Sequence, residues 1–394
     1  MDDDAVAFWL GSYTPGADGA GDGTGVGVRA LGREESGGLV PIADVEADSP
    51  SWVVQHPTLP VVYAAEEFSG FVVAFRASPD GTLTPLGDPV EVGGIVCHLT
   101  VASRGDALIA SCYGDGRVVV LALAPDGSLF RTPVELAPAV DPYVVPTSAT
   151  LARGGLLLPD SATDPTEPAS TDVDPRQSRA HTSRWLSDGR LATTDLGFDL
   201  VRFWRRGSSS TAPLVLDHEV TLPRGVGPRH LAWHESGHLH VVTEYSIEVF
   251  TLRAGHDGRF SVVAGVEATS DGAQDGDSAA ELTVVGSREH LHTSVRGSDR
   301  ISTLQIRGDG SELRAVGDVD SGGAVPRHHA EDGGVLHVAN QGSGTIDSFE
   351  IDERTGVPAR RVGRVEVGSP TCLTPASVAG GATGERATAA PATE

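Results

Sequence analysis

The sequence contains no lysine, so all 29 of its basic residues are arginine. Schiff-base chemistry and any other mechanism that needs a lysine amine are therefore excluded. A site for an anion in this chain must use arginine, whose planar guanidinium can bind a carboxylate or a phosphate through two parallel hydrogen bonds. A genome rich in G and C is a sufficient explanation for the missing lysine, and we draw no functional conclusion from it.

Cysteine, aromatic residues and long apolar runs are also scarce. The three cysteines, Cys97, Cys112 and Cys372, do not have metal-ligand spacing and fit a reducing cytoplasm. No run approaches the roughly 18 apolar residues of a membrane helix, and the acidic start MDDD does not resemble a secretory signal. We therefore expect a cytoplasmic protein without a membrane partner.

Acidic residues outnumber basic ones, and the formal net charge of −25 favours solubility. Such a charge argues against nucleic acid or an anionic membrane as the partner, because both would be repelled. The 49 glycines and 25 prolines indicate many turns and few long helices.

A unit of three apolar strands joined by turns recurs along the chain, and its second strand ends in a short polar signature. Successive units lie roughly 48 residues apart, a period typical of a β-propeller with four strands in each blade. The step between the second and third units is longer and holds an acidic, proline-rich insertion at about 159–178, which we expect to be a surface loop. The six units begin at Ser49, Cys97, Ala180, Pro228, Ala279 and Pro326.

Two incomplete units remain at the ends of the chain. FWLGSYT, VGVRAL and GGLVPIADVEA near the N-terminus have the pattern of a second, third and fourth strand, and SPTCLTPA (369–376) that of a lone first strand. Joined, they would complete a seventh blade and remove an exposed sheet edge. The sequence thus predicts an all-β, seven-bladed β-propeller whose closing blade has one C-terminal and three N-terminal strands. We expect one domain over 1–378, a disordered tail over 379–394, and a monomer, because a closed ring needs no partner.

The segment GVGPRHLAWHESGHLHVVTEYS (225–246) has the pattern of an antiparallel hairpin, in which the start of one strand lies beside the end of the next. Arg229 and Glu244 should therefore meet at one sheet edge. The same argument places the start of every first strand and the end of every second strand at one mouth of the ring. Several arginines there would attract an anionic substrate. The expected mouth residues are His98, His181, Arg229, His230, Arg327 and His328 from first strands, and Glu66, Glu67, Cys112, Tyr113, Asp195, Glu244, Arg296, Asn340 and Gln341 from second strands.

The ordered motifs GSYT, CHLTV, RAHTS, TTDLG, GPRHLAWH, TEYS, VRGSD, PRHHA and ANQGSG resemble those of the seven-bladed lactonase family. That family includes the propeller-type 6-phosphogluconolactonases and the fungal carboxy-cis,cis-muconate cyclases. The resemblance extends from Phe8 to Ala376. It implies a catalytic histidine at His181, active-site arginines at Arg229 and Arg296, and an acid at Glu244. Where the family usually has His-Ala-His, this chain reads RAH and carries Arg179.

The resemblance implies hydrolysis of a sugar lactone, first of all 6-phospho-D-glucono-1,5-lactone in the pentose phosphate route. His181 would activate water as a general base, with Glu244 as an orienting group or as the base itself, and either assignment stays open. Arg229 and Arg296 would hold the phosphate or the developing oxyanion. No metal and no cofactor is expected, because ring opening needs only acid–base help and charge stabilisation. Further substrate contacts are expected from Arg327, His328, His98, Asn340, Gln341 and Tyr113.

Other interpretations of the same residues remain open. The arginines can serve as ion pairs between blades, and His181 can be a hydrogen-bonded turn residue. The same side chains would also suit a lactonising cyclase that acts on a muconate. A propeller that binds a partner without turnover is the alternative outside enzymes.

Overall fold

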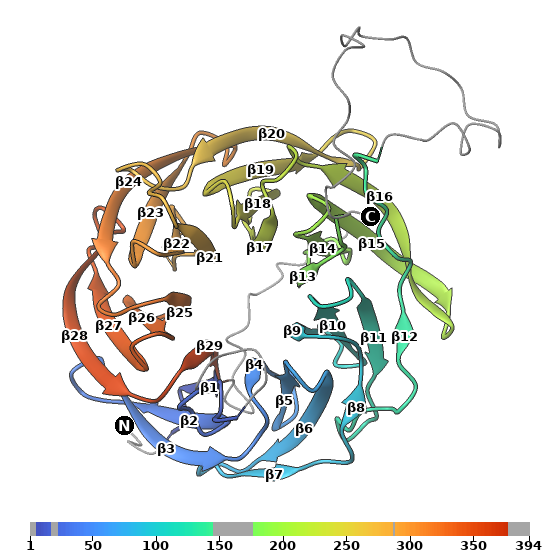
Figure 1. Ribbon diagram of the computed structural model, residues 1–394, viewed down its shortest axis with the longest axis horizontal. Helices are drawn as coiled ribbons and strands as arrows, with labels where there is room; N and C mark the ends of the chain where they lie inside the picture. Colours follow the sequence, from blue (N-terminus) through green and yellow to red (C-terminus); the bar gives the residue numbers. More distant parts are fainter. Residues whose placement is uncertain (1–4, 17–22, 145–175, 287, 377–394) are drawn as a thin grey trace, which may run out of the picture.

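The computed structural model describes residues 5–16, 23–144, 176–286 and 288–376. These residues form strands and no helix, and so no helix that could cross a membrane. Seven sheets surround a central axis as the blades of a propeller (Figure 1). The predicted fold is therefore confirmed. Residues 159–175 of the acidic insertion and the expected tail, 379–394, lie outside the described residues.

Six blades follow one another along the chain, and in each the first strand lies innermost. The first contains β4 (Pro50–Gln55), β5 (Val61–Glu66), β6 (Phe71–Ala77) and β7 (Leu83–Pro85), with β8 (Val90–Glu91) paired to β6. The second contains β9 (Val96–Val101), β10 (Ala107–Cys112), β11 (Val118–Ala122) and β12 (Val134–Glu135), and the third β13 (Ala180–Trp185), β14 (Leu191–Asp195), β15 (Leu200–Ser209) and β16 (Ala212–Thr221).

The remaining three of these blades have the same order. The fourth contains β17 (Pro228–Trp233), β18 (His238–Thr243), β19 (Glu248–Ala254) and β20 (Phe260–Glu267). The fifth contains β21 (Ser278–Val284), β22 (His290–Arg296), β23 (Arg300–Arg307) and β24 (Glu312–Asp320). The sixth contains β25 (Pro326–Asp332), β26 (Val335–Asn340), β27 (Thr345–Ile351) and β28 (Pro358–Glu366).

The seventh blade closes the ring as predicted, with the order β29 (Pro370–Pro375), β1 (Phe8–Ser12), β2 (Val28–Arg33) and β3 (Leu39–Val45). β29 pairs antiparallel with β1, so that Leu10 lies opposite Leu373. On one face Leu373 packs with Ala330 and Ala339 of the sixth blade. On the other face Cys372 packs with Val53 of the first blade. Figure 1 shows the C-terminal strand beside the N-terminal ones.

Apolar side chains fill the spaces between neighbouring blades. The second strand of each blade is covered on both sides, which explains its nearly continuous apolar sequence; β5 reads VVYAAE and is buried up to its last residue. The outermost strands, such as β3, bury only some of their residues and alternate more clearly with polar ones. The core is therefore a ring of apolar layers that leaves the axis free for polar side chains.

Each of the seven innermost strands contains a β-bulge near its start. In β17, Pro228 lies opposite Thr243 and His230 opposite Val242, so Arg229 is an extra residue in the register. The same shift occurs in β4, β9, β13, β21, β25 and β29. A regular strand would send Arg229 and His230 to opposite faces, whereas a bulge re-aims its side chains. Both residues consequently face the central channel, as do Arg327 and His328.

Ring closure predicts a large cost for shortening a buried side chain of β29. Leu373 is 1% exposed, and Leu373→Ala should lower the free energy of unfolding by about 3 kcal/mol through lost apolar burial and a residual cavity. Urea unfolding measures the change. The control Val140→Ala, at a residue that is 74% exposed, should change it by less than about 0.5 kcal/mol. Equal effects of the two substitutions would contradict a closure that depends on β29.

Candidate active site

The first residues of the innermost strands surround a small cavity on the propeller axis. About 10 Å³ of it is open to the centre of a water molecule, which is room for about one water. The cavity itself is therefore too small to hold a molecule larger than water. The lining residues are Ser51, Trp52, Cys97, His181, Arg229, His230, Arg327, His328 and Thr371.

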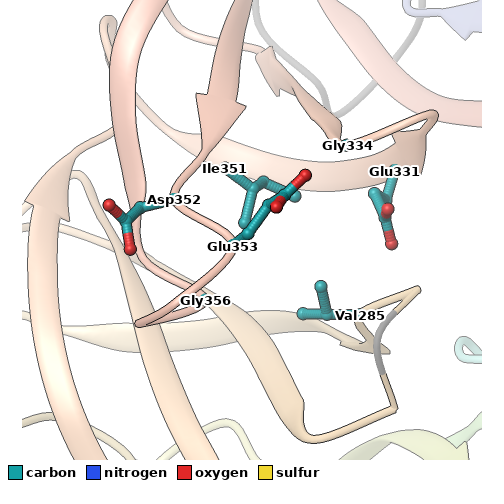
Figure 2. A pocket seen from close by; sticks show the side chains of 7 residues that line it. All are labelled: Val285, Glu331, Gly334, Ile351, Asp352, Glu353 and Gly356. Carbon is teal, nitrogen blue, oxygen red and sulfur yellow. The ribbon is translucent and has the colours of Figure 1, made fainter.

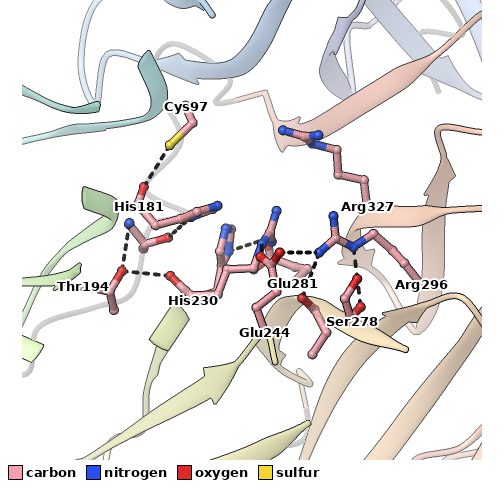
Figure 3. Close-up of polar contacts among 12 residues, drawn as sticks. Cys97, His181, Thr194, His230, Glu244, Ser278, Glu281, Arg296 and Arg327 are labelled. Atoms are coloured by element: carbon pink, nitrogen blue, oxygen red, sulfur yellow. Dashed lines mark hydrogen bonds and ion pairs between the residues drawn. The ribbon is translucent and has the colours of Figure 1, made fainter. Parts of the chain in front are cut away.

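Two arginines share one carboxylate at this mouth. Arg229 Nε lies 2.9 Å from Glu244 Oε2, and Arg296 Nη2 lies 3.1 Å from Glu244 Oε1, which confirms the expected meeting of Arg229 and Glu244. Figure 3 shows Glu244, Arg296, His181 and His230 gathered at one place although separate strands carry them. The Arg229 side chain is 4% exposed, and burial lowers its pKa to about 10. Its Nε and Nη1 are buried and make no hydrogen bond within the described residues, so they are donors that an anionic ligand at the cavity can satisfy.

Arg327 stands at the same mouth with its own carboxylate. Its Nη2 lies 3.3 Å from Glu67 Oε2, which also accepts a 2.8 Å hydrogen bond from the Tyr13 hydroxyl. Its Nη1 donates to Gln341 Oε1 at 3.4 Å, and the guanidinium lies 5.1 Å from the centre of the Tyr13 ring. Gln341 thus reaches the mouth as expected, by way of Arg327.

His181 lines the cavity as a buried, neutral imidazole. Burial is the main reason that its pKa lies well below the ordinary value, and the charge of Arg229 lowers it further. A neutral imidazole can accept a proton. Within the described residues its ring makes a single hydrogen bond, a long one of 3.4 Å between Nδ1 and Thr182 Oγ1. The ring centre lies 5.2 Å from that of His230 and 6.2 Å from that of Tyr113.

Arg179, which replaces the first histidine of the family's stretch, lies beside Tyr113. Its guanidinium is 4.6 Å from the centre of the tyrosine ring, a cation–π contact. Arg179 is thus held against Tyr113, whose ring centre lies 6.2 Å from that of His181.

Of the six expected substrate contacts, Arg327 and His328 line the cavity, whereas His98, Asn340, Gln341 and Tyr113 do not. Two of these four are held by other parts of the fold. The amide of Asn340 is fully buried and donates to the Ser321 carbonyl at 2.9 Å and to Asp347 at 3.1 Å. His98 lies against Trp52 with 4.2 Å between ring centres, and its Nδ1 accepts a 3.4 Å hydrogen bond from the Ser183 N–H. The polar atoms of Asn340 and His98 are thus bonded to other parts of the protein, and neither side chain lines the cavity.

The sequence interpretation missed a buried acid behind the cavity. Glu281 Oε2 lies 2.8 Å from His230 Nδ1 and 3.1 Å from His328 Nε2, and the residue is 5% exposed. Burial raises its pKa above the ordinary value. A signal was present: in the fifth unit Glu281 has the strand position that His230 and His328 have in the fourth and sixth. An alignment of the repeats would have found it.

A larger cavity than this one lies elsewhere, beside Val285 and Glu331 at the far ends of β21 and β25 (Figure 2). It measures about 320 Å³, and its charged lining residues are the acids Glu331, Asp352 and Glu353. No arginine or histidine lines it, so it lacks the groups that acid–base chemistry on an anion requires. Within the described residues no group of three His, Cys, Asp or Glu side chains is arranged to hold a metal ion.

Comparison with known proteins gives a consistent result over nearly the whole chain. The family model described as "Lactonase, 7-bladed beta-propeller" matches residues 7–375. A 6-phosphogluconolactonase of Bacillus subtilis is 25% identical, over 93% of this chain and 97% of its own. One of Pectobacterium atrosepticum is 27% identical, over 75% of this chain and 92% of its own. The fold is also that of a periplasmic gluconolactonase from Pseudomonas aeruginosa, with a TM-score of 0.78, 23% identity, and coverage of 95% of this chain and 99% of the other.

The buried histidines predict acid sensitivity. Burial lowers the pKa of His328 and of His337 to about 4, whereas an unfolded histidine has a pKa of about 6.5. As the pH falls below that value the unfolded chain takes up protons that the folded chain does not, so stability falls. At pH 5 the loss is about 2 kcal/mol for each such histidine. The raised pKa values of the carboxyl groups of Glu66, Asp195 and Glu281 act in the opposite direction, but the histidines whose pKa is lowered by burial are more numerous.

Urea unfolding at pH 7 and pH 5 measures this loss. His337→Gln should make the loss smaller by about 2 kcal/mol, because one histidine no longer takes up a proton on unfolding. The same substitution at the exposed His256 should leave the loss unchanged. Equal stability of the wild-type protein at both pH values would contradict the assignment of these histidines as neutral.

Proposed function

Since the chain belongs to the family of seven-bladed β-propeller lactonases, we propose that it hydrolyses a small anionic sugar lactone. The first substrate to test is 6-phospho-D-glucono-1,5-lactone, which would give 6-phosphogluconate. The protein would act as a cytoplasmic monomer in the pentose phosphate route. One observation carries the proposal: two arginines share a single carboxylate beside neutral imidazoles, around a cavity of about one water.

The charges at the mouth suit an anionic substrate. Arg229, Arg296 and Arg327 bring three guanidinium groups to the mouth, and Arg229 and Arg296 share the single carboxylate of Glu244. On a protein with a net charge of −25, this cluster supplies the charge-assisted hydrogen-bond donors that an anion requires. The free N–H of Arg229 can then stabilise the oxyanion that forms at the lactone carbonyl.

The chemical steps need a proton acceptor near that oxyanion. Water attacks the carbonyl carbon and loses a proton to a neutral imidazole, and the carbonyl oxygen becomes the oxyanion. The ring C–O bond then breaks, and the imidazolium returns the proton to the departing ring oxygen. His181, the base expected from the sequence, lines the cavity. Glu244 is held by two arginines, which makes it a counter-ion rather than a base in this proposal.

Purified protein should release acid from freshly generated 6-phospho-D-glucono-1,5-lactone faster than the uncatalysed rate. His181→Ala should lower kcat/KM by at least about 10-fold, because a group in contact with the reacting atoms is lost. A pH-stat measures acid release. A wild-type rate no higher than that of His181→Ala would reject the proposal.

Arg296→Gln should raise KM for the phosphorylated lactone by about 10-fold or more, because a charge-assisted contact to an anion is lost. The increase for unphosphorylated gluconolactone should be smaller. The control is Arg253→Gln, which removes an exposed arginine paired with Asp309 on the surface. Equal effects of Arg296→Gln on both lactones would show that this arginine does not bind the phosphate.

A further inference from the structure

Three imidazoles, those of His181, His230 and His328, line the central cavity, and the protein holds them differently. His181 has one long contact with the Thr182 hydroxyl at 3.4 Å, and no ion pair joins it to a carboxylate in the described part of the chain. His230 has its Nδ1 2.8 Å from Glu281 Oε2, and both residues are buried. A carboxylate behind Nδ1 is the arrangement that orients a catalytic imidazole and stabilises its protonated form.

The hydrogen bonds around Glu281 fix where the protons lie. The backbone N–H of Leu373 donates to His328 Nδ1 at 3.2 Å, so this nitrogen carries no proton. His328 is neutral near pH 7 because its pKa is about 4, and its proton is therefore on Nε2, 3.1 Å from Glu281 Oε2. The other oxygen, Oε1, accepts the Leu282 N–H at 3.1 Å. Glu281 is thus placed as an acceptor between the two imidazoles, with Oε2 close to both but without a well-aligned hydrogen bond within the described residues.

The same reasoning gives the tautomer of His230. Because the acceptor Glu281 Oε2 lies 2.8 Å from His230 Nδ1, we place the proton of the neutral imidazole on Nδ1. Burial and the nearby Arg229 hold the pKa of His230 well below its ordinary value, so Nε2, on the other edge of the ring, has a free lone pair. The approach of both histidines to Oε2 is not ideally aligned, as is common for catalytic hydrogen bonds before substrate binds.

We propose that His230 is the general base of the lactonase site and that Glu281 is its positioning residue. The proposal rests on the proposed function and identifies the proton acceptor within it. Water in the cavity loses its proton to His230 Nε2 as its oxygen bonds to the carbonyl carbon. The resulting imidazolium is stabilised by Glu281 and later protonates the departing ring oxygen. His181, which has no carboxylate, contacts the lactone instead.

Charged and titratable groups from every neighbouring strand act on His230. Arg229, Arg296 and Arg327 disfavour its protonated form, and Glu281 favours it. An anionic substrate bound to the arginines offsets their charge, so the basicity of His230 should increase when the substrate binds. The other groups that face its ring are His98, His181, His328 and Trp52.

Kinetics of three variants test the pair. His230→Gln and Glu281→Gln should each lower kcat on 6-phospho-D-glucono-1,5-lactone by about 100-fold with KM changed less than about 3-fold, and the double variant should lose no more than either one. His240→Gln is the control, because it also places an amide at a fully buried histidine, far from the cavity lining. It should keep the wild-type kcat. Two results would overturn the proposal. One is an active wild type together with a His230→Gln variant whose kcat is within about 3-fold of the wild-type value; the other is a double variant in which the two losses of kcat add.

The pH dependence of the Glu281→Gln variant shows whether Glu281 positions the His230 imidazole or only supports the fold. Loss of the Glu281 charge should lower the pKa of the His230 imidazole, so the acid limb of kcat/KM should move to lower pH by about one unit or more. If the Glu281→Gln variant had a low kcat but the acid limb of its kcat/KM profile stayed at the wild-type pH, Glu281 would only support the fold.

A second measurement does not depend on turnover. In protein labelled with ¹⁵N-histidine, side-chain NMR should show the Nδ1–H tautomer for His230 and the Nε2–H tautomer for His328, with His230→Gln used to assign the first signal. A wild-type protein without lactonase activity would reject the proposed function, and the tautomers would then decide whether Glu281 holds His230 as a base. An Nε2–H tautomer at His230 would overturn the inference in either case.

Discussion

The structure depends above all on the pairing of β29 with β1, which converts a row of sheets into a closed ring. Only in a closed ring do the starts of all seven innermost strands face one axis. The groups at the candidate site lie far apart in the chain: Arg327 meets Glu67, and Glu281 meets both His230 and His328. Each of these contacts joins different blades, so each needs the ring geometry that closure enforces.

Within that ring the protein balances buried charges by sharing them. Arg229 and Arg296 share Glu244, and His230 and His328 share Glu281. A buried charge without a partner would be costly, while a fully paired set would have nothing to offer a ligand. Because the carboxylates are shared, Arg229 keeps N–H groups without a hydrogen bond within the described residues. In the proposed mechanism the Nε2 edge of His230 is likewise left free to accept a proton.

The sequence was sufficient for the fold and for part of the site. The repeat and the two incomplete ends predicted the closing blade, and hairpin geometry predicted the contact of Arg229 with Glu244, because both follow from strand order. The bulges could not be predicted, since strand alternation sends Arg229 and His230 to opposite faces and no special residue marks the shift. Asn340 was expected at the mouth for its position alone, and its partners Ser321 and Asp347 come from long-range packing that no local pattern contains.

The hydrogen bond from the Leu373 backbone to His328 has a consequence for synthesis. A ribosome makes the chain from the N-terminus, so six blades are complete by the end of β28, at Glu366, while the donor of this bond has not yet been made. Until β29 has emerged, no backbone N–H is present to keep the proton of His328 off Nδ1. In the proposed mechanism the tautomer of His230 also depends on this bond, because both histidines lie against Glu281. The nascent protein would therefore gain its activity with its last strand, and a chain that terminates early would have six blades but no working centre.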